Sequence, residues 1–500
     1  MRSSNMFHSG VLQPFQQACS TFAGSNAFCI NEVFYSYRQL GETISAIRAE
    51  VKKFSADNIN VGLVANDDLE TYAAIFALWL EGKCYVPINP ETPAERNRNV
   101  LQQAGATVVI DSSDQPLYTE FNVIRSKELT FTTIDLEPVT VSDDERAYIF
   151  FTSGTTGVPK GVPITRENLA GFIKAFFELG ISMDSSDKCL QMFELTFDLS
   201  VMSYLAPLLR GACVYTIPKN KIKFNYIADL LEEHQLTVAL MVPSIIHYLR
   251  PYLDEIHCES MKFSLFCGEA LPLDVTSEWA NSIPNARIMN VYGPTEDTIF
   301  CTHYTYNRTG ENKASNGLLC IGKAMNGTYT IIVNDKKEIV APGEKGELCL
   351  GSIQLTPGYW KNDEKNKDAF FHIEYDGAST RFYKTGDLCS ADEAGDIMYL
   401  GRIDSQVKVQ GFRVELSEIE FFAKEFLEKV NAVAIAFTNQ LNNTEIGMVI
   451  ESTEFDTKPM IEYMKTKMPG YMIPTQLRFI NTFPLNTNGK IDRKVLKEKF

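Results

Sequence analysis

A polar, glycine-rich stretch occupies positions 152–161 of the 500-residue chain and reads Thr152-Ser153-Gly154-Thr155-Thr156-Gly157-Val158-Pro159-Lys160-Gly161. It directly follows a strand-like apolar run at 147–151, and a loop at a strand end presents backbone N–H groups to an anion. Glycine permits positive φ and close approach by phosphate oxygens, hydroxyl groups donate hydrogen bonds, and Lys160 adds a point charge. The glycine spacing excludes a Walker A loop. The stretch therefore predicts a polyphosphate-binding loop, with an ordinary polar surface loop as the alternative.

The composition excludes several classes of protein. A hydrophobic fraction of 45% with 22% charged residues is ordinary for a globular protein. The net charge of −16 argues against a nucleic-acid partner, because phosphate backbones are bound by clustered Lys and Arg. Residues 405–500 hold 13 Lys and Arg against 12 Asp and Glu, so the rest of the chain carries −17. The C-terminal segment can thus meet an acidic partner that the rest would repel.

The eleven cysteines are scattered, with neither a Cys-x-x-Cys pair nor a tight Cys/His cluster, so a disulfide framework and a structural zinc site are not indicated. We expect reduced thiols. The first residues lack the charged and apolar regions of a signal peptide, and the longest apolar run, 72–80, is far too short to span a bilayer. The sequence therefore predicts a cytoplasmic protein with no membrane span.

The order of helical and strand-like patterns predicts the architecture. Residues 11–150 alternate helical periodicity with short apolar runs, which is typical of a mostly parallel sheet covered by helices. A predicted helix at 166–180 opens a second round of alternation that continues to residue 300. Between 315 and 400 the spacing shortens and turns become frequent, which predicts antiparallel strands or a small barrel.

Beyond a predicted linker at 401–405, the pattern changes to a small α+β domain. The signature Ser417-Glu418-Ile419-Glu420 is typical of a capping box and predicts a helix that begins there and ends near 430. Strands at 431–437 and 445–451 and a helix at 460–468 follow. The predicted fold class is α/β: a large N-terminal domain (1–401) of two α/β sheet subdomains plus a small β-barrel-like subdomain, a hinge (402–405), and a small mobile α+β C-terminal domain (406–500).

Eight further signatures accompany the glycine-rich stretch. In chain order they are Leu80-x-Gly82-x-x-Tyr85-Val86-Pro87, Phe197-Asp198-Leu199-Ser200, Asn290-Val291-Tyr292-Gly293-Pro294-Thr295-Glu296, Gly346-Glu347-Leu348-Cys349-Leu350-Gly351, Tyr383-Lys384-Thr385-Gly386-Asp387-Leu388, Gly401-Arg402-Ile403-Asp404, the run at 406–416, and Asn488-Gly489-Lys490-Ile491-Asp492-Arg493. From about residue 35 to 493 the chain resembles the acyl-adenylate-forming superfamily. Within it, the chain is most similar to the amino-acid adenylation domains of peptide synthetases and the D-alanine–carrier-protein ligases.

The resemblance implies an ATP site. Attack of a carboxylate on the α-phosphorus builds negative charge, so cations and a metal must surround it. Tyr292 is implied to stack on adenine, Glu296 to bind Mg²⁺ and Asp387 to accept from both ribose hydroxyls. Turn or surface roles are the alternative for Glu269 and Tyr399. The implied nucleotide-binding residues are Thr152, Ser153, Gly154, Thr155, Thr156, Gly157, Lys160, Gly268, Glu269, Ala270, Asn290, Val291, Tyr292, Gly293, Pro294, Thr295, Glu296, Asp387, Tyr399, Arg402 and Lys490.

Lys490 is the implied catalytic residue. On composition alone it would be an exposed lysine in a basic tail, but the resemblance places it between the substrate carboxylate and the ATP phosphates. The small domain must then close over the large one. Between the two half-reactions we expect rotation about Asp404, which replaces Lys490 with a hairpin at 409–413.

The resemblance also narrows the substrate. Asp198 is implied to bind the α-ammonium group of an amino acid, and its apolar sequence neighbours would make an unpaired carboxylate costly. The implied substrate contacts are Asp198, Met202, Leu240, Cys267, Val291, Gly293, Ile299 and Lys490, and Leu199, Leu265 and Phe300 also fall on the side-chain pocket. This apolar lining disfavours charged and amide side chains. The runs 197–202 and 266–269 resemble the D-alanine ligases, in which the cysteine helps to select a small D-residue.

The expected function is ATP-dependent activation of a small apolar amino acid, D-alanine in particular, as aminoacyl-AMP with release of pyrophosphate. Transfer to the phosphopantetheine thiol of a separate, acidic carrier protein then follows. ATP and Mg²⁺ are the implied cofactors, and we expect a monomer. An acyl- or aryl-CoA synthetase and a catalytically inactive nucleotide-binding homologue are the alternatives.

Overall fold

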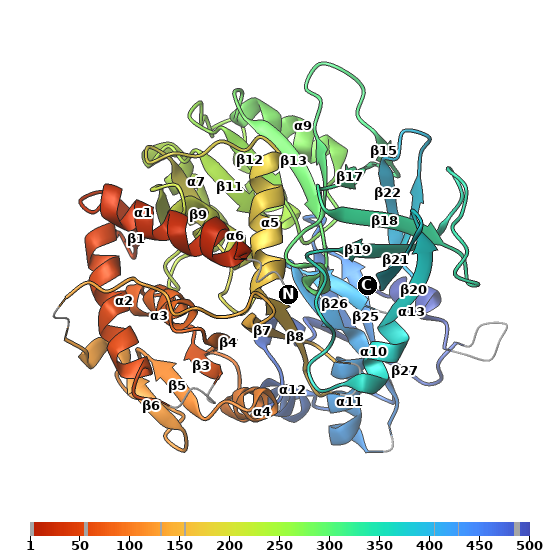
Figure 1. Ribbon diagram of the computed structural model, residues 1–500. Helices are drawn as coiled ribbons and strands as arrows, with labels where there is room; N and C mark the ends of the chain where they lie inside the picture. The colour runs from red at the N-terminus through yellow and green to blue at the C-terminus, as the bar shows by residue number, and fades with distance from the viewer. Residues whose placement is uncertain are drawn as a thin grey trace.

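The computed structural model describes residues 5–54, 59–130, 133–154, 157–404, 406–428, 430–484 and 491–500. The fold consists of two large sheets with their helices, an antiparallel sheet and a C-terminal subdomain (Figure 1), and the first two strands of the chain belong to the second large sheet. One cluster of buried apolar side chains joins the two large sheets, and residues 406–500 have separate clusters. The predicted α/β class with a large N-terminal and a small C-terminal part is confirmed.

The first large sheet has six strands and supplies the glycine-rich loop. Its order is β6(Asn122–Arg125), β5(Val108–Asp111), β3(Asn60–Val64), β4(Cys84–Ile88), β7(Arg146–Thr152), β8(Lys160–Thr165). All neighbours are parallel except β7 and β8. Helices α3(Leu69–Leu80) and α4(Ala94–Ala104) pack on its strands, and α2(Tyr37–Val51) packs on α3 and on β1(Asn26–Ile30) and β2(Val33–Ser36) of the second large sheet. The apolar run at 72–80 lies in α3 and is fully buried, which explains why it is apolar all round.

The second large sheet has nine strands. Its order is β17(Lys323–Ala324), β14(Thr302–Thr305), β13(Arg287–Tyr292), β12(Phe263–Phe266), β11(Val238–Met241), β9(Lys188–Gln191), β10(Cys213–Thr216), β1(Asn26–Ile30), β2(Val33–Ser36). Strands β13 to β1 are parallel, and the edge strands are antiparallel. The helices of this region are η1(His8–Leu12), α1(Gln13–Thr21), α5(Arg166–Glu178), α6(Leu199–Leu208), α7(Lys223–Glu233), α8(Pro243–Leu249) and α9(Leu273–Ser282). The helix predicted at 166–180 is confirmed as α5, which Thr165 and Asn168 cap.

The region predicted as antiparallel is a five-stranded sheet. Its path is β18(Thr328–Val333), β19(Gly346–Ser352), β21(Ala378–Ala391), β20(Phe370–Tyr375), with β22(Ile397–Arg402) also paired to β21. Helix α10(Asp363–Ala369) precedes β20, and the hairpin β15(Ala314–Ser315), β16(Leu318–Leu319) lies before this sheet. Short 3-10 turns complete the chain: η2(Ser126–Glu128), η3(Arg250–Tyr252), η4(Thr295–Asp297) and η5(Gly470–Met472). Arg402, the first residue of the predicted hinge, is still in strand β22.

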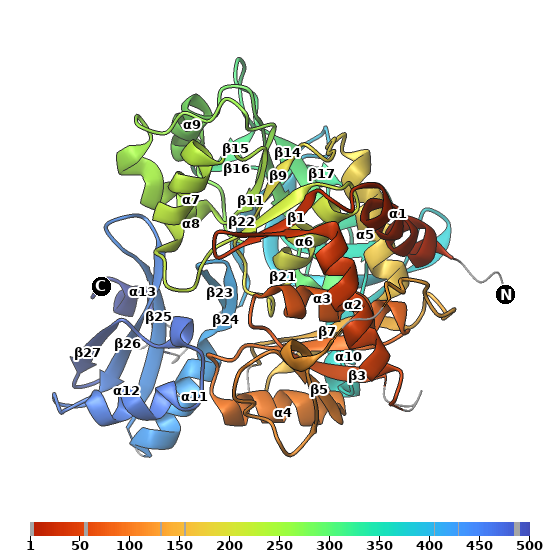
Figure 2. The ribbon, with the colours of Figure 1, turned by 90° about the vertical axis from the view of Figure 1, so that its left-hand side faces the viewer.

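The C-terminal subdomain (residues 406–500) begins with a hairpin and continues as a three-stranded sheet. Its elements are β23(Gln406–Val409), β24(Phe412–Glu415), α11(Leu416–Leu427), β25(Ala432–Thr438), β26(Thr444–Glu451), α12(Lys458–Lys465), β27(Gln476–Ile480) and α13(Arg493–Lys497). Both predicted strands agree with β25 and β26 within one residue, and the second predicted helix agrees with α12 within three. Figure 2 shows this subdomain beside α4, and an ion pair between Arg96 of α4 and Glu418 of α11 joins them.

The capping box predicted at Ser417–Glu420 is wrong. Helix α11 begins at Leu416, so Ser417 is already inside the helix, and its buried hydroxyl has no hydrogen-bond partner among the described residues. The Glu420 carboxylate instead accepts from Ala434 N at 2.9 Å and pairs with Arg493 at 2.7 Å. Tertiary contacts with β25 and α13 therefore replace the local cap.

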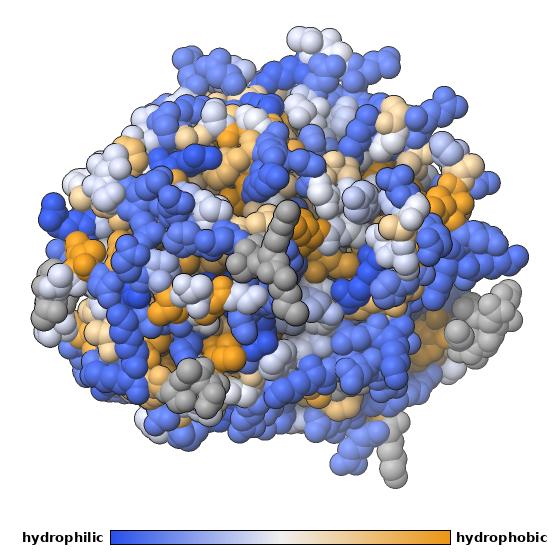
Figure 3. All heavy atoms as spheres, in the orientation of Figure 1, coloured by the Kyte–Doolittle hydropathy of each residue, from blue (hydrophilic) through white to orange (hydrophobic). Residues whose placement is uncertain are grey.

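The hydropathy of the surface and the state of the cysteines agree with what the composition predicts. Hydrophilic residues cover most of the face in Figure 3, with hydrophobic ones scattered among them. All eleven cysteines are buried and free of disulfides. No helix in the described part of the chain is long and apolar enough to cross a bilayer.

Candidate active site between the two subdomains

The glycine-rich loop is the turn of the β7–β8 hairpin. Thr152 at the end of β7 pairs with Lys160 at the start of β8. A Cβ at Gly154 would lie 2.0 Å from the carbonyl oxygen of Val158, so only glycine fits there. Gly157 has φ +77°, whereas neither Gly154 nor Gly161 has a positive φ. The tight turn thus fixes Lys160 on a strand, directly across from Thr152.

The C-terminal subdomain supplies partners for this loop. The N–H of Gly154 donates to Glu418 Oε2 at 3.1 Å, and Lys160 Nζ lies 3.3 Å from Glu415 Oε1. The Ser153 hydroxyl donates to the carbonyl of Arg413 at 2.8 Å. Glu418 is fully buried and pairs with Arg96 at 2.6 Å. Two carboxylates therefore occupy the donors that the sequence assigns to phosphate.

Glu296, the predicted metal ligand, is fully buried beside the same loop. Arg413 Nη1 donates to both of its carboxylate oxygens, at 2.9 and 3.1 Å, and the Tyr359 hydroxyl donates to Oε1 at 2.6 Å. Burial opposes ionisation, but Arg413, Tyr359 and Lys160 together lower the pKa of Glu296 to about 2. The carboxylate is thus charged at neutral pH and paired with Arg413.

The predicted ribose-binding residues lie together. Arg402 Nη1 donates to Asp387 Oδ1 at 2.9 Å and to the carbonyl of Thr385 at 2.7 Å. The Tyr292 hydroxyl donates to the other oxygen of Asp387. Asp387 is 5% exposed. This arrangement leaves a buried, oriented carboxylate at the wall of a cavity, where it can accept from a pair of hydroxyl groups.

That cavity has a volume of about 380 Å³ and contains the predicted adenine wall. Asn290 is held by its Nδ2, which donates to the carbonyls of Cys320 at 2.9 Å and Leu319 at 3.3 Å. The predicted nucleotide residues that line this cavity are Gly268, Glu269, Ala270, Asn290, Val291, Tyr292, Asp387, Tyr399 and Arg402. The structure thus brings nine of them to one space.

Glu269 has a structural contact that the sequence did not reveal. Its Oε2 accepts from the N–H of Ser244 at 2.8 Å, and its Oε1 accepts from the N–H of Gly411 at 2.9 Å. Ser244 lies at the start of α8 and Gly411 at the tip of the β23–β24 hairpin. Glu269 therefore fixes the hairpin tip to the large subdomain.

Asp198 is 3% exposed, and within the described residues its Oδ2 has no hydrogen-bond partner. Burial, opposed by the Thr295 side chain, raises the pKa of Asp198 to about 7. It lines a cavity of about 50 Å³ together with Leu199, Cys267 and Ile299. A buried carboxylate that lacks a partner is costly, and a ligand cation would remove that cost.

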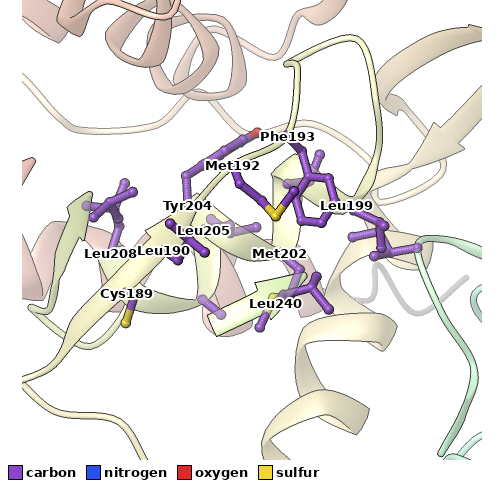
Figure 4. Close-up of a cluster of buried hydrophobic side chains, with 14 of the residues drawn as sticks. Cys189, Leu190, Met192, Phe193, Leu199, Met202, Tyr204, Leu205, Leu208 and Leu240 are labelled. Carbon is purple, nitrogen blue, oxygen red and sulfur yellow. The ribbon is translucent and has the colours of Figure 1, made fainter. Parts of the chain in front are cut away.

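The residues predicted to form the substrate pocket lie in three different places. Gly293, Pro294 and Thr295 also line the small cavity, whereas Val291 lines the larger one. Met202, Leu240, Leu265 and Phe300 are buried in the core behind it. Figure 4 shows Met202 and Leu240 near each other among such side chains. These four residues line none of the three cavities described in this subsection.

The β23–β24 hairpin contributes side chains that the sequence reasoning did not single out. Val409 and Val414 belong to the C-terminal core, while the alternate residues Gln406, Lys408, Arg413 and Glu415 lie at the site. Lys408 Nζ lies 5.8 Å from the centre of the Tyr292 ring. The alternation of apolar and polar residues in this run is the signal that could have found them. Thr155, Thr156, Ser405 and Lys490 lie outside the described residues.

A third cavity, of about 100 Å³, reaches the same point from the junction of the subdomains. It is lined by Thr152 and Asp198 of the large subdomain and by Phe412, Pro469 and Tyr471 of the small one. The rings of Phe412 and Tyr471 stack with centroids 4.0 Å apart. The small cavity thus adjoins the third cavity at Asp198 and the nucleotide-sized cavity at Tyr292 and Asp387.

Comparison with known families decides the affiliation. The family model described as "AMP-binding enzyme" matches residues 15–360. The chain belongs to the AMP-binding enzyme family. Among curated members, it is 30% identical to gramicidin S synthase 1 of Brevibacillus brevis over 505 residues and 29% identical to tyrocidine synthase 1 of Brevibacillus parabrevis over 499 residues. Each match covers 98% of this chain but only 44% and 45% of the respective synthases.

Solved structures of the AMP-binding enzyme fold agree with this affiliation. The Vibrio cholerae adenylation domain AlmE, in complex with glycyl-adenosine-5'-phosphate, has a TM-score of 0.86 at 24% identity and covers 97% of both chains. NpsA-ThdA, an artificially fused adenylation–PCP di-domain from Klebsiella oxytoca, has a TM-score of 0.82 at 21% identity, with 94% of this chain and 93% of that chain covered. At these identities the likeness concerns the fold.

Proposed function

We propose that this AMP-binding enzyme activates a small apolar amino acid as aminoacyl-AMP and then transfers the aminoacyl group to a phosphopantetheine thiol of a separate carrier protein. The observation that carries the proposal is Asp198. It is a buried carboxylate, one oxygen of which has no hydrogen-bond partner among the described residues, and it lines a small cavity next to the glycine-rich loop and the wall of the nucleotide-sized cavity. An amino-acid substrate carries an α-ammonium group, a small cation that can pair with the carboxylate of Asp198 in this cavity.

ATP is the proposed nucleotide. The ribose hydroxyls would replace Tyr292 and Arg402 as partners of Asp387, and the phosphates would bind Lys160 and the N–H groups of the glycine-rich loop. Glu296 fits Mg²⁺ because it is an ionised hard oxygen donor beside that loop, and Mg²⁺ takes one or two carboxylates plus phosphate oxygens. Bound there, the metal would offset phosphate charge. Since Arg413 binds both oxygens of Glu296, metal and arginine are alternative partners.

The two half-reactions use different domain arrangements in this proposal. Lys490 would act with ATP and the amino acid, and the β23–β24 hairpin would replace it for transfer, by rotation within 402–405. The described arrangement corresponds to the second state, because Arg413 and Glu415 of the hairpin contact Glu296 and Lys160. The elongated cavity beside Phe412 and Tyr471 would then admit the pantetheine arm.

A small D-amino acid, D-alanine in particular, is the proposed substrate. The cavity beside Asp198 has a volume of only about 50 Å³, which suits a small side chain, and Leu199, Cys267 and Ile299 form the apolar part of its lining. Similarity of the runs 197–202 and 266–269 to D-alanine ligases supports the same choice. The close balance of charge in residues 405–500 favours an acidic carrier.

The decisive experiment is ATP–pyrophosphate exchange with a panel of D- and L-amino acids, fatty acids and aryl acids. We expect exchange with small apolar amino acids, highest with D-alanine, and none for Asp198→Asn. Leu195→Met, a volume-conserving change of a buried residue that lines none of these three cavities, is the matched control. Exchange with acids that lack an amine would favour the CoA-synthetase alternative, and failure with every acid would favour an inactive nucleotide-binding protein.

A further inference from the structure

Asn443 is an unused amide at the wall of the nucleotide-sized cavity. It lies in the turn between β25 and β26 of the C-terminal subdomain and is 4% exposed. Neither Oδ1 nor Nδ2 has a hydrogen-bond partner in the described part of the chain. A buried amide with both groups unmet is unfavourable, so the site suits a ligand that offers one donor and one acceptor.

The turn does not need the Asn443 side chain. The Asn439 side chain accepts from Leu441 N at 2.9 Å and from Asn443 N at 3.0 Å, and the Asn443 carbonyl accepts from Asn439 N at 2.9 Å. The backbone of Asn443 is therefore fixed by its neighbours. Its amide is thus held in position without a bond to its own turn.

The other walls of the cavity indicate what that is. Asn443 faces the space that Asn290, Tyr292, Asp387 and Arg402 also line, where the proposed function places a nucleoside. Adenine presents an N6–H donor next to an N7 acceptor, and an asparagine amide matches this pair with two hydrogen bonds. Hypoxanthine has an acceptor at position 6 and fails this match.

We propose that Asn443 recognises the adenine base of bound AMP through its amide. This inference rests on the proposed function and extends it, since no residue of the C-terminal subdomain was assigned to the base. Because Asn443 is brought to the cavity with the docked hairpin, its contact belongs to the transfer arrangement. It would hold AMP during transfer without contributing to the binding of ATP in the first step.

Tyr248 of α8 is the competing partner within the protein. Burial raises the pKa of its hydroxyl, and the Asn443 side chain acts in the opposite direction, so the two groups are close. If Asn443 serves only to bind Tyr248, removal of the Tyr248 hydroxyl has the same effect as removal of the amide. A Tyr248→Phe variant therefore separates the two roles.

The test compares AMP and inosine monophosphate, by direct calorimetric binding and as inhibitors of transfer from isolated aminoacyl-AMP. We expect Asn443→Ala to lose about tenfold in AMP affinity, to lose the preference for AMP over inosine monophosphate, and to keep the KM for ATP in exchange within about twofold. Gln440→Ala, which removes an exposed amide from the same turn, is the matched control. Asn443→Asp preserves the shape and should lose AMP affinity but keep the preference for AMP, because its carboxylate accepts from N6–H of adenine and cannot donate to N7 or to the oxygen of hypoxanthine.

Two results would overturn the inference. One is an unchanged AMP affinity and AMP preference in both Asn443 variants, and the other is an equal loss in Tyr248→Phe. This test and the exchange test of the proposed function can fail independently, because binding of AMP and inosine monophosphate is measured without an amino acid. A wild-type protein that exchanges with no acid can still support or refute the role of Asn443.

Discussion

Arg413→Ala should slow transfer selectively. In the described arrangement, Arg413 of the C-terminal subdomain is the cation paired with Glu296, which is fully buried in the large subdomain. Loss of one partner of a buried pair costs about 3–5 kcal/mol, because the remaining charge is uncompensated. Tyr359 still donates to Glu296 and Lys160 still acts on its charge, so we expect the lower end, about 3 kcal/mol.

The loss of the Arg413–Glu296 pair should shift the equilibrium between the docked and undocked arrangements of the two subdomains. It should have little effect on the free energy of unfolding. The pair joins two subdomains with separate cores, so the variant can leave the docked arrangement and rehydrate Glu296. A cost of about 3 kcal/mol corresponds to a roughly 150-fold smaller population of that arrangement. The transfer rate should fall by about 100-fold, while pyrophosphate exchange, in which Glu296 is proposed to bind the metal, stays within a few-fold of wild type.

The assay is single-turnover transfer from isolated aminoacyl-AMP to a carrier thiol, run beside pyrophosphate exchange. Arg478→Ala, an exposed arginine of the same subdomain, is the control and should leave both rates unchanged. Arg413→Lys should be intermediate, since it keeps the charge but loses the planar fork. Equal losses in transfer and exchange for Arg413→Ala would refute an arrangement-specific role for the pair.

Three further changes test the rest of the site. Asp198→Asn should abolish exchange; it should also raise the free energy of unfolding at pH 8 by on the order of 3 kcal/mol but not at pH 4, because the raised pKa of about 7 destabilises the ligand-free fold as pH rises between about 4 and 7. Denaturant titration at both pH values checks this. Lys490→Ala should reduce exchange by several orders of magnitude and leave transfer largely intact, as rapid-quench kinetics would measure. Cys267→Ala should enlarge the small cavity and broaden the exchange profile to larger side chains and to both chiralities.

Each has a result that would contradict it. If Asp198→Asn and wild type have the same free energy of unfolding at both pH values, the ionised carboxylate of Asp198 does not destabilise the ligand-free fold. Parallel losses in both half-reactions for Lys490→Ala would argue against two arrangements. An unchanged profile for Cys267→Ala would remove this residue from the pocket, and Cys258→Ala, a buried cysteine elsewhere, controls for loss of packing.

Local patterns predicted the elements better than the contacts between them. The run at 147–151, the glycines and Lys160 specify a strand, a tight turn and a strand, because each property acts within a few residues. The capping box failed because Glu420 gains more from Ala434 and Arg493, which no local rule contains. The role of Glu418 at the loop likewise depends on Arg96, more than 300 positions away, and on the docking of a whole subdomain.

The structure separates the predicted pocket residues by depth, which the sequence did not do. Leu199, Cys267 and Ile299 line the small cavity, whereas Met202 and Leu240 lie behind it, although all five are equally apolar in the sequence. Periodicity assigns a residue to the buried side of an element. It does not say whether the buried side meets a space or another side chain, since that depends on the packing of several elements at once.

The carboxylates of Glu415 and Glu418 on the glycine-rich loop set an order of events. They engage Lys160 and the N–H of Gly154, the same donors that a triphosphate or pyrophosphate would need. In the proposed reaction, departure of pyrophosphate and docking of the hairpin would therefore be coupled: free pyrophosphate would compete with docking, and hydrolysis of pyrophosphate would favour docking. The fraction of bound aminoacyl-AMP that proceeds to transfer would thus depend on the pyrophosphate concentration around the protein, because pyrophosphate and the C-terminal subdomain would compete for the same donors.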